Sequence, residues 1–208
     1  TYYFHAAIGM EVTTQDFCSS IQDADRPYVW DLNRIFGITA QTAQEIDQAM
    51  AFAEARRQAL GYAYISASPY MEETPVIQMV LQAPLKAIHP AGYSLHPVIS
   101  DTDWHRLYEL VLTDHSEGAR TRGKKVEAHV TRGMVDGYRR KTGPCRFFLA
   151  SIDDTPCAYG SATIAPNGMG MVEDLFTLPA FRRRGLASAL ISDCVDHLRQ
   201  NGCTDILI

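Results

Sequence analysis

The residues best suited to chemistry in this sequence form the run Arg182-Arg183-Arg184-Gly185-Leu186-Ala187, where a strand turns into a helix. The first turn of a helix leaves backbone N–H groups without intrahelical partners, at the positive end of the helix dipole. Such a turn is a natural phosphate site. Gly185, which has no side chain, lets a phosphate approach the backbone, and the small side chain of Ala187 allows the same approach two residues later. The run therefore predicts a phosphate-binding turn, with a solvated cluster of surface arginines as the alternative.

The elements around this turn indicate an α/β fold with a mixed sheet. Three strands are expected before it, and the short turns between them imply antiparallel hairpins: Arg146–Ile152, Cys157–Ile164 and Met169–Leu178. After it, the apolar spacing of Leu186, Leu190, Cys194 and Leu198 predicts an amphipathic helix that ends at Gly202. Thr204–Ile208 is a short final strand. This strand–helix–strand unit favours parallel pairing through a right-handed crossover.

Further elements lie on either side of a Pro- and Gly-containing seam between Ala83 and Gly92. Before the seam we expect a helix at Gln44–Leu60 and strands at Tyr2–Val12, Tyr62–Ser66 and Val76–Leu81, with Tyr28–Ile38 irregular. After it we expect a strand at Tyr93–Ile99 and a helix that starts at Ser100, where Ser100 and Asp103 would form the N-terminal cap. A second helix is expected over Glu127–Tyr138.

The stretch from Leu175 to Ala187 resembles the fourth strand, loop and third helix of the GCN5-related N-acetyltransferases (GNAT family). The loop of that family is Gln/Arg-x-x-Gly-x-Gly/Ala, and Arg182, Gly185 and Ala187 match its three defined positions. The spacing Pro179-x-x-Arg182 also fits. The resemblance covers Tyr93 to Ile208.

The resemblance implies that acetyl-CoA is the cosubstrate and that no metal takes part. Backbone groups of Phe176, Thr177 and Leu178 would bond the pantetheine arm like an added strand. The pyrophosphate would lie on the turn and the first helical residues, namely Arg182, Arg183, Arg184, Gly185, Leu186, Ala187 and Ser188.

The resemblance also implies a catalytic base on the strand before the loop. Glu173 and Asp174 are adjacent there, and in a regular strand they point to opposite faces, so that only one can face the substrate. Members with a similar pair indicate Glu173 as the base that deprotonates the attacking amine. The alternative is that both carboxylates have no chemical role. A backbone N–H of the same strand would hold the developing oxyanion.

We expect two parts, an accessory α/β segment at residues 1–90 and a GNAT domain at residues 93–208. The family domain continues past its fifth strand into a helix with an acid-supplying tyrosine, and we expect this chain to lack that part. The first part resembles a degenerate half-copy of the GNAT fold or a permuted tail, and we favour the half-copy. Since it has no second Arg-x-x-Gly-x-Gly/Ala loop, we expect no coenzyme there.

Composition limits the remaining function classes. The formal charge of −5 argues against a nucleic-acid partner. The five cysteines form no C-x-x-C pair and suggest neither disulfides nor zinc. Because no apolar run could span a bilayer and no signal peptide is visible, we expect a cytoplasmic protein without a membrane partner.

The leading hypothesis is direct transfer of an acetyl group from acetyl-CoA to a primary amine of a small molecule or peptide. The acceptor would lie against the segment Asp114–Lys141, and a homodimer is left open. The alternative is a catalytically silent coenzyme A-binding or interaction module.

Overall fold

The computed structural model describes residues 11–22, 34–36, 39–60, 64–65, 79–82, 85, 87–121, 123–140 and 142–208. Contacts between residues divide the chain into two compact units, unit 1 at Thr1–Ile77 and unit 2 at Gln78–Ile208. Residues 78–90, which were expected in the accessory segment, therefore fall in the second unit.

Unit 1 contains a four-stranded sheet in the order β1-β2-β3-β4. β1 (Glu11–Gln15) and β2 (Cys18–Gln22) form an antiparallel hairpin, and β3 (Arg34–Phe36) pairs antiparallel with β2. Helix α2 (Ala43–Leu60) then leads to β4 (Tyr64–Ile65), which is parallel to β3. The predicted helix is confirmed, whereas the stretch expected to be irregular contains β3. The predicted strand at Tyr2–Val12 lies largely outside the described residues.

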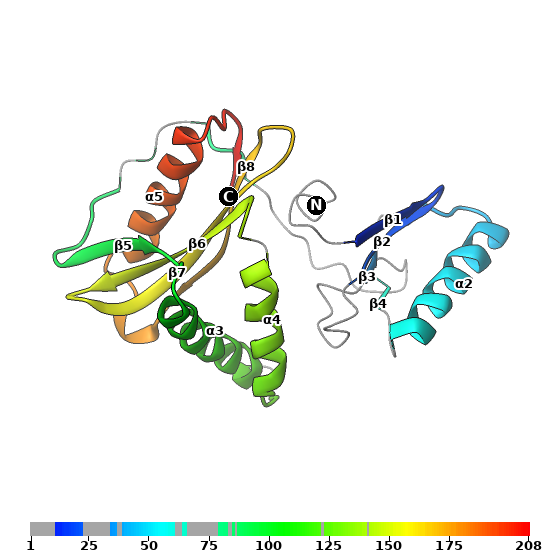
Figure 1. The fold of residues 1–208 in the computed structure, drawn as a ribbon, viewed down its shortest axis with the longest axis horizontal. Helices are drawn as coiled ribbons and strands as arrows, with labels where there is room; N and C mark the ends of the chain where they lie inside the picture. Colours follow the sequence, from blue (N-terminus) through cyan, green and yellow to red (C-terminus); the bar gives the residue numbers. More distant parts are fainter. Residues whose placement is uncertain are drawn as a thin grey trace. The chain divides into compact units, whose positions relative to one another are not determined.

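Unit 2 contains a five-stranded mixed sheet in the order β5-β6-β7-β8-β9, which confirms the predicted fold class (Figure 1). β5 (Tyr93–Pro97), β6 (Cys145–Ile152), β7 (Thr155–Ile164) and β8 (Gly170–Thr177) are antiparallel neighbours. β9 (Ile206–Leu207) is parallel to β8 and follows helix α5 (Leu186–Gln200). Asp153 and Asp154, both with positive φ, form the tight turn between β6 and β7.

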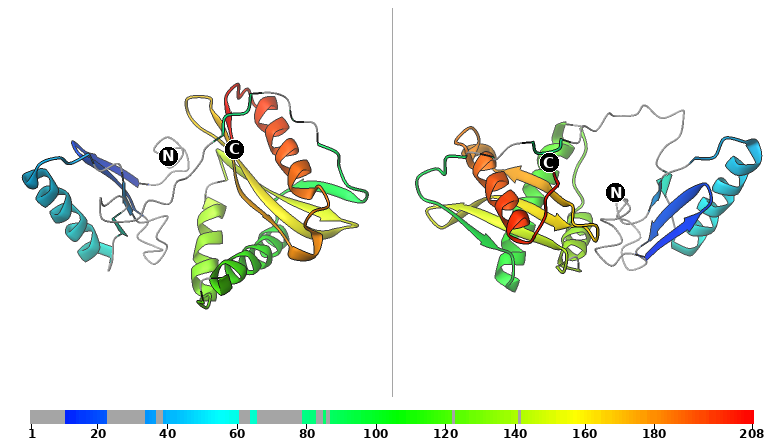
Figure 2. Two further views of the ribbon diagram at one scale, coloured as in Figure 1. Left: turned by 180° about the vertical axis from the view of Figure 1, so that it is seen from behind. Right: turned by 90° about the horizontal axis from the view of Figure 1, so that it is seen from above.

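Helices cover both faces of this sheet, α5 on one face and α3 (Asp101–Thr121) and α4 (Ala128–Arg140) on the other (Figure 2). Beneath α5, Leu190 and Leu198 pack with Val172 and Ile206 in the main apolar cluster. On the opposite face the ring of Phe147 lies 6.2 Å from Trp104 and 4.4 Å from Tyr138 between ring centroids. The sheet is therefore covered on both faces, and β8 lies between α5 and the α3–α4 pair.

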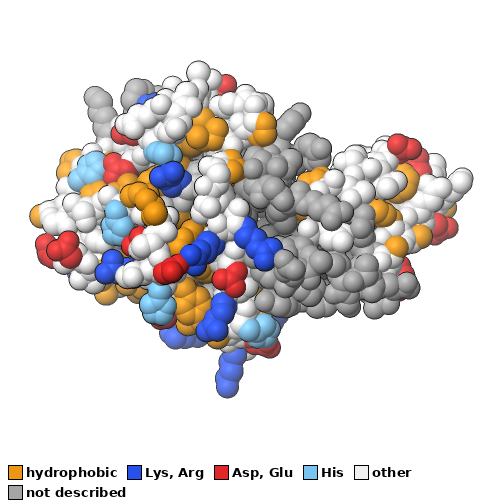
Figure 3. Space-filling model, viewed as in Figure 1, with side chains coloured by type: hydrophobic (Ala, Val, Ile, Leu, Met, Phe, Trp, Pro, Cys, Tyr) orange, Lys and Arg blue, Asp and Glu red, His pale blue; other side chains and the backbone are white. Residues whose placement is uncertain are grey.

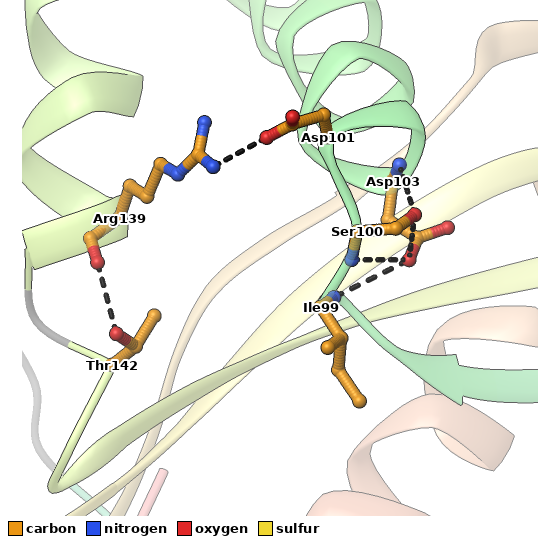
Figure 4. A network of polar contacts seen from close by, with 6 residues as sticks. All are labelled: Ile99, Ser100, Asp101, Asp103, Arg139 and Thr142. Carbon is orange, nitrogen blue, oxygen red and sulfur yellow. Dashed lines mark hydrogen bonds and ion pairs between the residues drawn. The ribbon is translucent and has the colours of Figure 1, made fainter.

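Helix α3 begins with the capping box that the sequence predicts (Figure 4). The amide of Ser100 donates to the Asp103 carboxylate at 2.9 Å, and the amide of Asp103 donates back to the Ser100 hydroxyl at 3.2 Å. Arg139, near the end of α4, forms an ion pair with Asp101 in the first turn of α3. These contacts fix the start of α3 against the end of α4.

Helix α2 of unit 1 begins with a second capping box. The Glu45 carboxylate accepts from the amides of Gln41 and Thr42 at 2.9 and 3.0 Å, and its own amide donates to the Thr42 hydroxyl at 3.2 Å. The two backbone hydrogen bonds lower the pKa of Glu45, so the carboxylate is anionic. The Glu45 carboxylate thus bonds the amides of the two residues that precede α2, and the Thr42 hydroxyl bonds one amide of its first turn.

The strand connections of unit 1 repeat those of the second half of unit 2. In both, three antiparallel strands lead through a helix to a fourth strand that is parallel to the third: β1-β2-β3-α2-β4 and β6-β7-β8-α5-β9. The loop before α2 therefore stands at the same topological position as the arginine-rich turn before α5.

Residues Met79–Leu81 pair with the outer edge of β9. Met79 and Ile208 exchange backbone hydrogen bonds of 3.1 and 2.9 Å, and the amide of Leu81 donates to the carbonyl of Ile206 at 2.9 Å. Val80 bridges Leu207 in an antiparallel sense. The described part of the strand predicted at Val76–Leu81 thus completes the sheet of unit 2.

Candidate active site

The phosphate-binding turn predicted from sequence lies between β8 and α5. A short 3₁₀ helix, η2 (Pro179–Phe181), carries the chain off the strand. Arg183 and Gly185 then both adopt left-handed backbone conformations, with φ of 60° and 83°. An added Cβ at Gly185 would meet the Ile88 carbonyl only at 3.7 Å. Glycine is therefore favoured here by the left-handed backbone conformation.

The N-terminus of α5 is open. Gly185 is the N-cap residue, and no side chain of the described residues caps this helix. The first intrahelical bond to Gly185 comes from Ala189, at 3.0 Å. The amides of Leu186, Ala187 and Ser188 precede it and have no intrahelical partner. α2 and α3 begin with capping boxes, whereas no described side chain caps α5, so its first amides are available to an anion.

A pocket of about 440 Å³ lies at this helix end. It is lined from three directions, by the end of β8, the turn and the first turns of α5: Leu175, Phe176, Thr177, Phe181, Arg182, Arg183, Gly185, Leu186, Ala187, Ser188 and Leu190. Of the predicted coenzyme-binding residues, only Leu178 and Arg184 are not part of this lining. The structure thus brings the predicted set together around one cavity.

The side chain of Arg182 is engaged within the protein. Its guanidinium donates to both Glu117 carboxylate oxygens, at 2.7 and 2.5 Å, and its Nε donates to the Thr177 carbonyl at 2.9 Å. The guanidinium also lies 5.6 Å from the centre of the Phe176 ring. The hydrogen bond between them lowers the pKa of Glu117 and raises that of Arg182, so both remain charged. Arg182 therefore fixes the turn to β8 and α3, and Glu117 neutralises much of its charge.

The outer edge of β8 is the side on which β9 pairs with it. Among the described residues, β9 pairs only with Gly170 and Met171. The Leu178 amide donates to the Cys157 carbonyl on the opposite side, at 2.9 Å, so Leu178 offers no amide to a ligand, which corrects that part of the expectation. Because backbone groups alternate between edges, Thr177 presents its N–H at the open edge, towards the pocket.

Glu173 and Asp174 lie on the same face of β8, contrary to the simple alternation expected. Ser161 opposes Glu173 and Tyr159 opposes Phe176, so Asp174 and Leu175 together face Gly160 in a β-bulge. Asp174 has a left-handed φ of 53°. The Ser161 hydroxyl, on the same face as its cross-strand partner Glu173, donates to Asp174 at 3.0 Å. Glu173 is exposed, and Asp174 is half-buried.

The α3–α4 face beside these carboxylates carries groups that the sequence reasoning did not identify. The Tyr138 hydroxyl donates to Asp174 at 3.1 Å, and the Tyr159 hydroxyl donates to Asp114 at 2.9 Å. Burial, with Asp114 as a second cause, raises the pKa of Tyr159. These pairs join residues far apart in the chain, and no local pattern marks them.

Within the described ranges, no group of three or more His, Cys, Asp or Glu residues could hold a metal ion. No described helix is long and apolar enough to cross a membrane. On the face seen in Figure 3, basic and acidic side chains are interspersed.

The chain matches the model of the Acetyltransferase (GNAT) family over residues 104–208. No curated protein matches it. A GCN5-related N-acetyltransferase from Kribbella flavida is similar over 97% of this chain and 80% of its own, with a TM-score of 0.65 and 14% identity. That similarity extends over both units and concerns the fold.

Two other solved structures are similar over 55% of this chain. One is an acetyltransferase of the GNAT family from Staphylococcus aureus, with 11% identity, 71% of its own chain covered and a TM-score of 0.45. The other is a predicted acetyltransferase from Clostridium acetobutylicum solved with acetyl-CoA, with 11% identity, 78% of its own chain covered and a TM-score of 0.44.

Proposed function

The chain belongs to the acetyltransferase (GNAT) family, and from this premise we propose that it transfers the acetyl group of acetyl-CoA directly to a primary amine. The observation that carries the proposal is the open N-terminus of α5, which adjoins the unpaired edge of β8 around one pocket. Acyl transfer from an acyl-CoA follows from family membership. The acetyl group, the amine acceptor and direct transfer are the parts that we propose.

The pocket suits coenzyme A in two respects. Its pyrophosphate would lie on the amides between Arg183 and Ser188, where a left-handed turn leads into an uncapped helix. The pantetheine arm would run along Phe176 and Thr177 and receive the Thr177 N–H, as an added strand would. Arg182 would hold this geometry through Glu117 and the Thr177 carbonyl.

Glu173 is the residue that we propose as the base. The exposed carboxylate would take a proton from the acceptor ammonium, directly or through a water, so that the neutral amine can attack the thioester carbonyl. A backbone N–H of β8 would stabilise the oxyanion that develops there. Cleavage of the C–S bond then releases coenzyme A, whose thiolate takes up a proton, and leaves the acetylated amine.

Two measurements test this function. Isothermal titration should detect acetyl-CoA binding, and release of the coenzyme thiol should be detectable with a panel of small amines and amine-bearing peptides. We expect Glu173→Gln to lower kcat by at least about a hundredfold, which is within the usual range for loss of a general base. Glu109→Gln, on an exposed face of α3, is the matched control and should leave kcat unchanged.

The outcomes separate the competing functions. Absence of heat at millimolar acetyl-CoA with folded protein would exclude the coenzyme site. Binding without turnover on any amine would favour the silent coenzyme-binding module. Turnover that is insensitive to Glu173→Gln would exclude Glu173 as the base.

We further propose that unit 1 is a degenerate GNAT half that binds no coenzyme. It repeats the strand connections of the coenzyme-binding half but has no second Arg-x-x-Gly-x-Gly/Ala loop, and before the corresponding helix the amides of Gln41 and Thr42 bond the Glu45 carboxylate. Titration should therefore give one acetyl-CoA per chain, and a stoichiometry of two would contradict this assignment. A cytoplasmic location remains part of the proposal.

A further inference from the structure

The bulge in β8 depends on a residue in a conformation that side chains rarely adopt. Asp174 has a φ of 53°, and with Leu175 it occupies the space opposite the single residue Gly160. Aspartate is among the few residues that tolerate this left-handed region. Something must nevertheless hold it there, because a regular strand would pair residue by residue.

The Asp174 carboxylate is fixed by donors from two other elements, and we call the three residues the Asp174 bridge. The Tyr138 hydroxyl, from α4, donates to Oδ1 at 3.1 Å, and the Ser161 hydroxyl, from β7, donates to Oδ2 at 3.0 Å. Tyr138 is only 4% exposed and Ser161 is fully buried. The bridge therefore ties the bulge to the helix layer and to the neighbouring strand at the same time.

The other bulged residue passes to the opposite face of the sheet. Leu175 lies so close to Gly160 that an added Cβ there would be 2.8 Å from the Leu175 Cδ2. Leu175 also lines the candidate coenzyme pocket. Asp174 thus anchors one side of the bulge while Leu175 shapes the pocket on the other.

The bulge lies at the point where β8 changes role. Before it, Gly170 and Met171 pair with β9. Immediately beside it stands Glu173, the proposed base, and beyond it Phe176 and Thr177 form the proposed pantetheine edge. A change in the backbone at Asp174 would move both functional segments relative to each other.

We propose that Asp174 is a positioning residue for acyl transfer, whose bridge to Tyr138 and Ser161 sets the bulge that aligns Glu173 with the coenzyme edge of β8. This inference rests on the proposed function. Asp174 acts through the backbone and does not itself exchange a proton with the acceptor. The pyrophosphate turn is held separately, by Arg182, Glu117 and Gly185, so loss of the bridge should affect the chemical step more than coenzyme binding.

The test compares three substitutions with different effects on the bridge. Asp174→Asn keeps the shape, tolerates a left-handed φ and can still bond both hydroxyls. Asp174→Ala removes the bridge, and Tyr138→Phe removes one donor. Asp196→Asn, an exposed carboxylate on α5 outside the proposed acceptor and coenzyme sites, is the matched control. We expect Asp174→Ala to lower kcat by about ten- to a hundredfold, as a displacement of about 1 Å can, with the coenzyme Kd changed less than threefold.

The pH profile of kcat/KM distinguishes positioning from catalysis. If Asp174 only positions, Asp174→Asn keeps the acidic limb that Glu173→Gln abolishes. Tyr138→Phe should give a smaller loss of kcat than Asp174→Ala, again with the limb intact. Loss of the acidic limb in Asp174→Asn would make Asp174 the base and overturn the inference.

Amide hydrogen exchange supplies a readout that does not depend on turnover. Asp174→Ala should raise exchange at residues 173–176 of the free protein at least about tenfold relative to Asp174→Asn, because the bridge limits local opening. Unchanged exchange together with unchanged kcat would refute the inference. If the wild-type protein bound no acetyl-CoA, the proposed function would fail while the exchange result still reported on the bridge.

Discussion

Two left-handed glycines at opposite ends of α5 permit a matched test of the coenzyme turn. Gly185 precedes the helix with a φ of 83°, and Gly202 follows it with a φ of 88°. A left-handed conformation costs other residues roughly 1–2 kcal/mol. An added Cβ at Gly185 meets its nearest atom at 3.7 Å, and at Gly202 it meets no described atom within 4 Å. Alanine at either position therefore introduces a conformational cost and no steric one.

The two variants should differ in where this cost appears. At Gly202 the helix end is held by the Gly202 and Cys203 amides, which bond Arg199 and Leu198, so the cost should reduce stability alone. At Gly185 the exposed turn can relax in the free protein, and coenzyme binding must then restore the left-handed conformation. A cost of about 1–2 kcal/mol corresponds to roughly a 5- to 30-fold weaker Kd.

Isothermal titration with acetyl-CoA and thermal unfolding measure the two parts. Gly202→Ala should lower the Tm by roughly 2–4 °C per kcal/mol and leave the Kd unchanged. For Gly185→Ala, the losses in stability and in binding free energy should together reach about 1–2 kcal/mol, mostly in binding. A combined loss well below this range would refute the account of the turn, as would an equal effect of Gly202→Ala on the Kd.

Three further predictions follow from contacts elsewhere in unit 2. Arg182→Lys keeps the charge but not the planar fork, so isothermal titration should show roughly three- to tenfold weaker acetyl-CoA binding; an unchanged Kd would mean that charge alone matters. Burial, with Arg146 as a second cause, lowers the pKa of His197, so unfolding takes up a proton. The free energy of unfolding, measured with urea, should fall as the pH drops below about 6.5, the ordinary pKa of histidine, and level off below the pKa of His197 in the folded protein. His197→Asn should weaken this pH dependence. An equal slope in the variant would contradict the role of His197. Burial raises the pKa of Cys194 to about 12, so a thiol reagent at pH 8 should modify it only after unfolding; rapid labelling of native protein, located by mass spectrometry, would show that this helix opens.

Local patterns sufficed to predict the turn and the elements that flank it. The apolar spacing after Gly185 predicted α5, and the short turns after Ile152 and Ile164 predicted the antiparallel hairpins, since both signals depend on neighbouring residues. The same holds for the cap at Ser100 and for α2. The loop motif, together with the strands around it, led to the family.

The site geometry could not be predicted in the same way, because it depends on contacts between distant residues. Glu117 and Arg182 are 65 residues apart, and Tyr138 and Asp174 are 36 apart. The bulge at Asp174 arises because two residues of β8 lie opposite one residue of β7, and alternation along a single strand does not reveal such a mismatch. β3 escaped prediction because three residues are too short to show a period.

The pairing of Met79–Leu81 with β9 bears on how unit 2 behaves as an isolated fragment. β9 has only two residues, and its edges are occupied by β8 and by these residues. A fragment that began at Tyr93 would leave the outer edge of β9 with bare N–H and C=O groups, which are templates for intermolecular association. A recombinant unit 2 that includes residues from Gln78 onward should therefore stay monodisperse at concentrations where the shorter fragment aggregates.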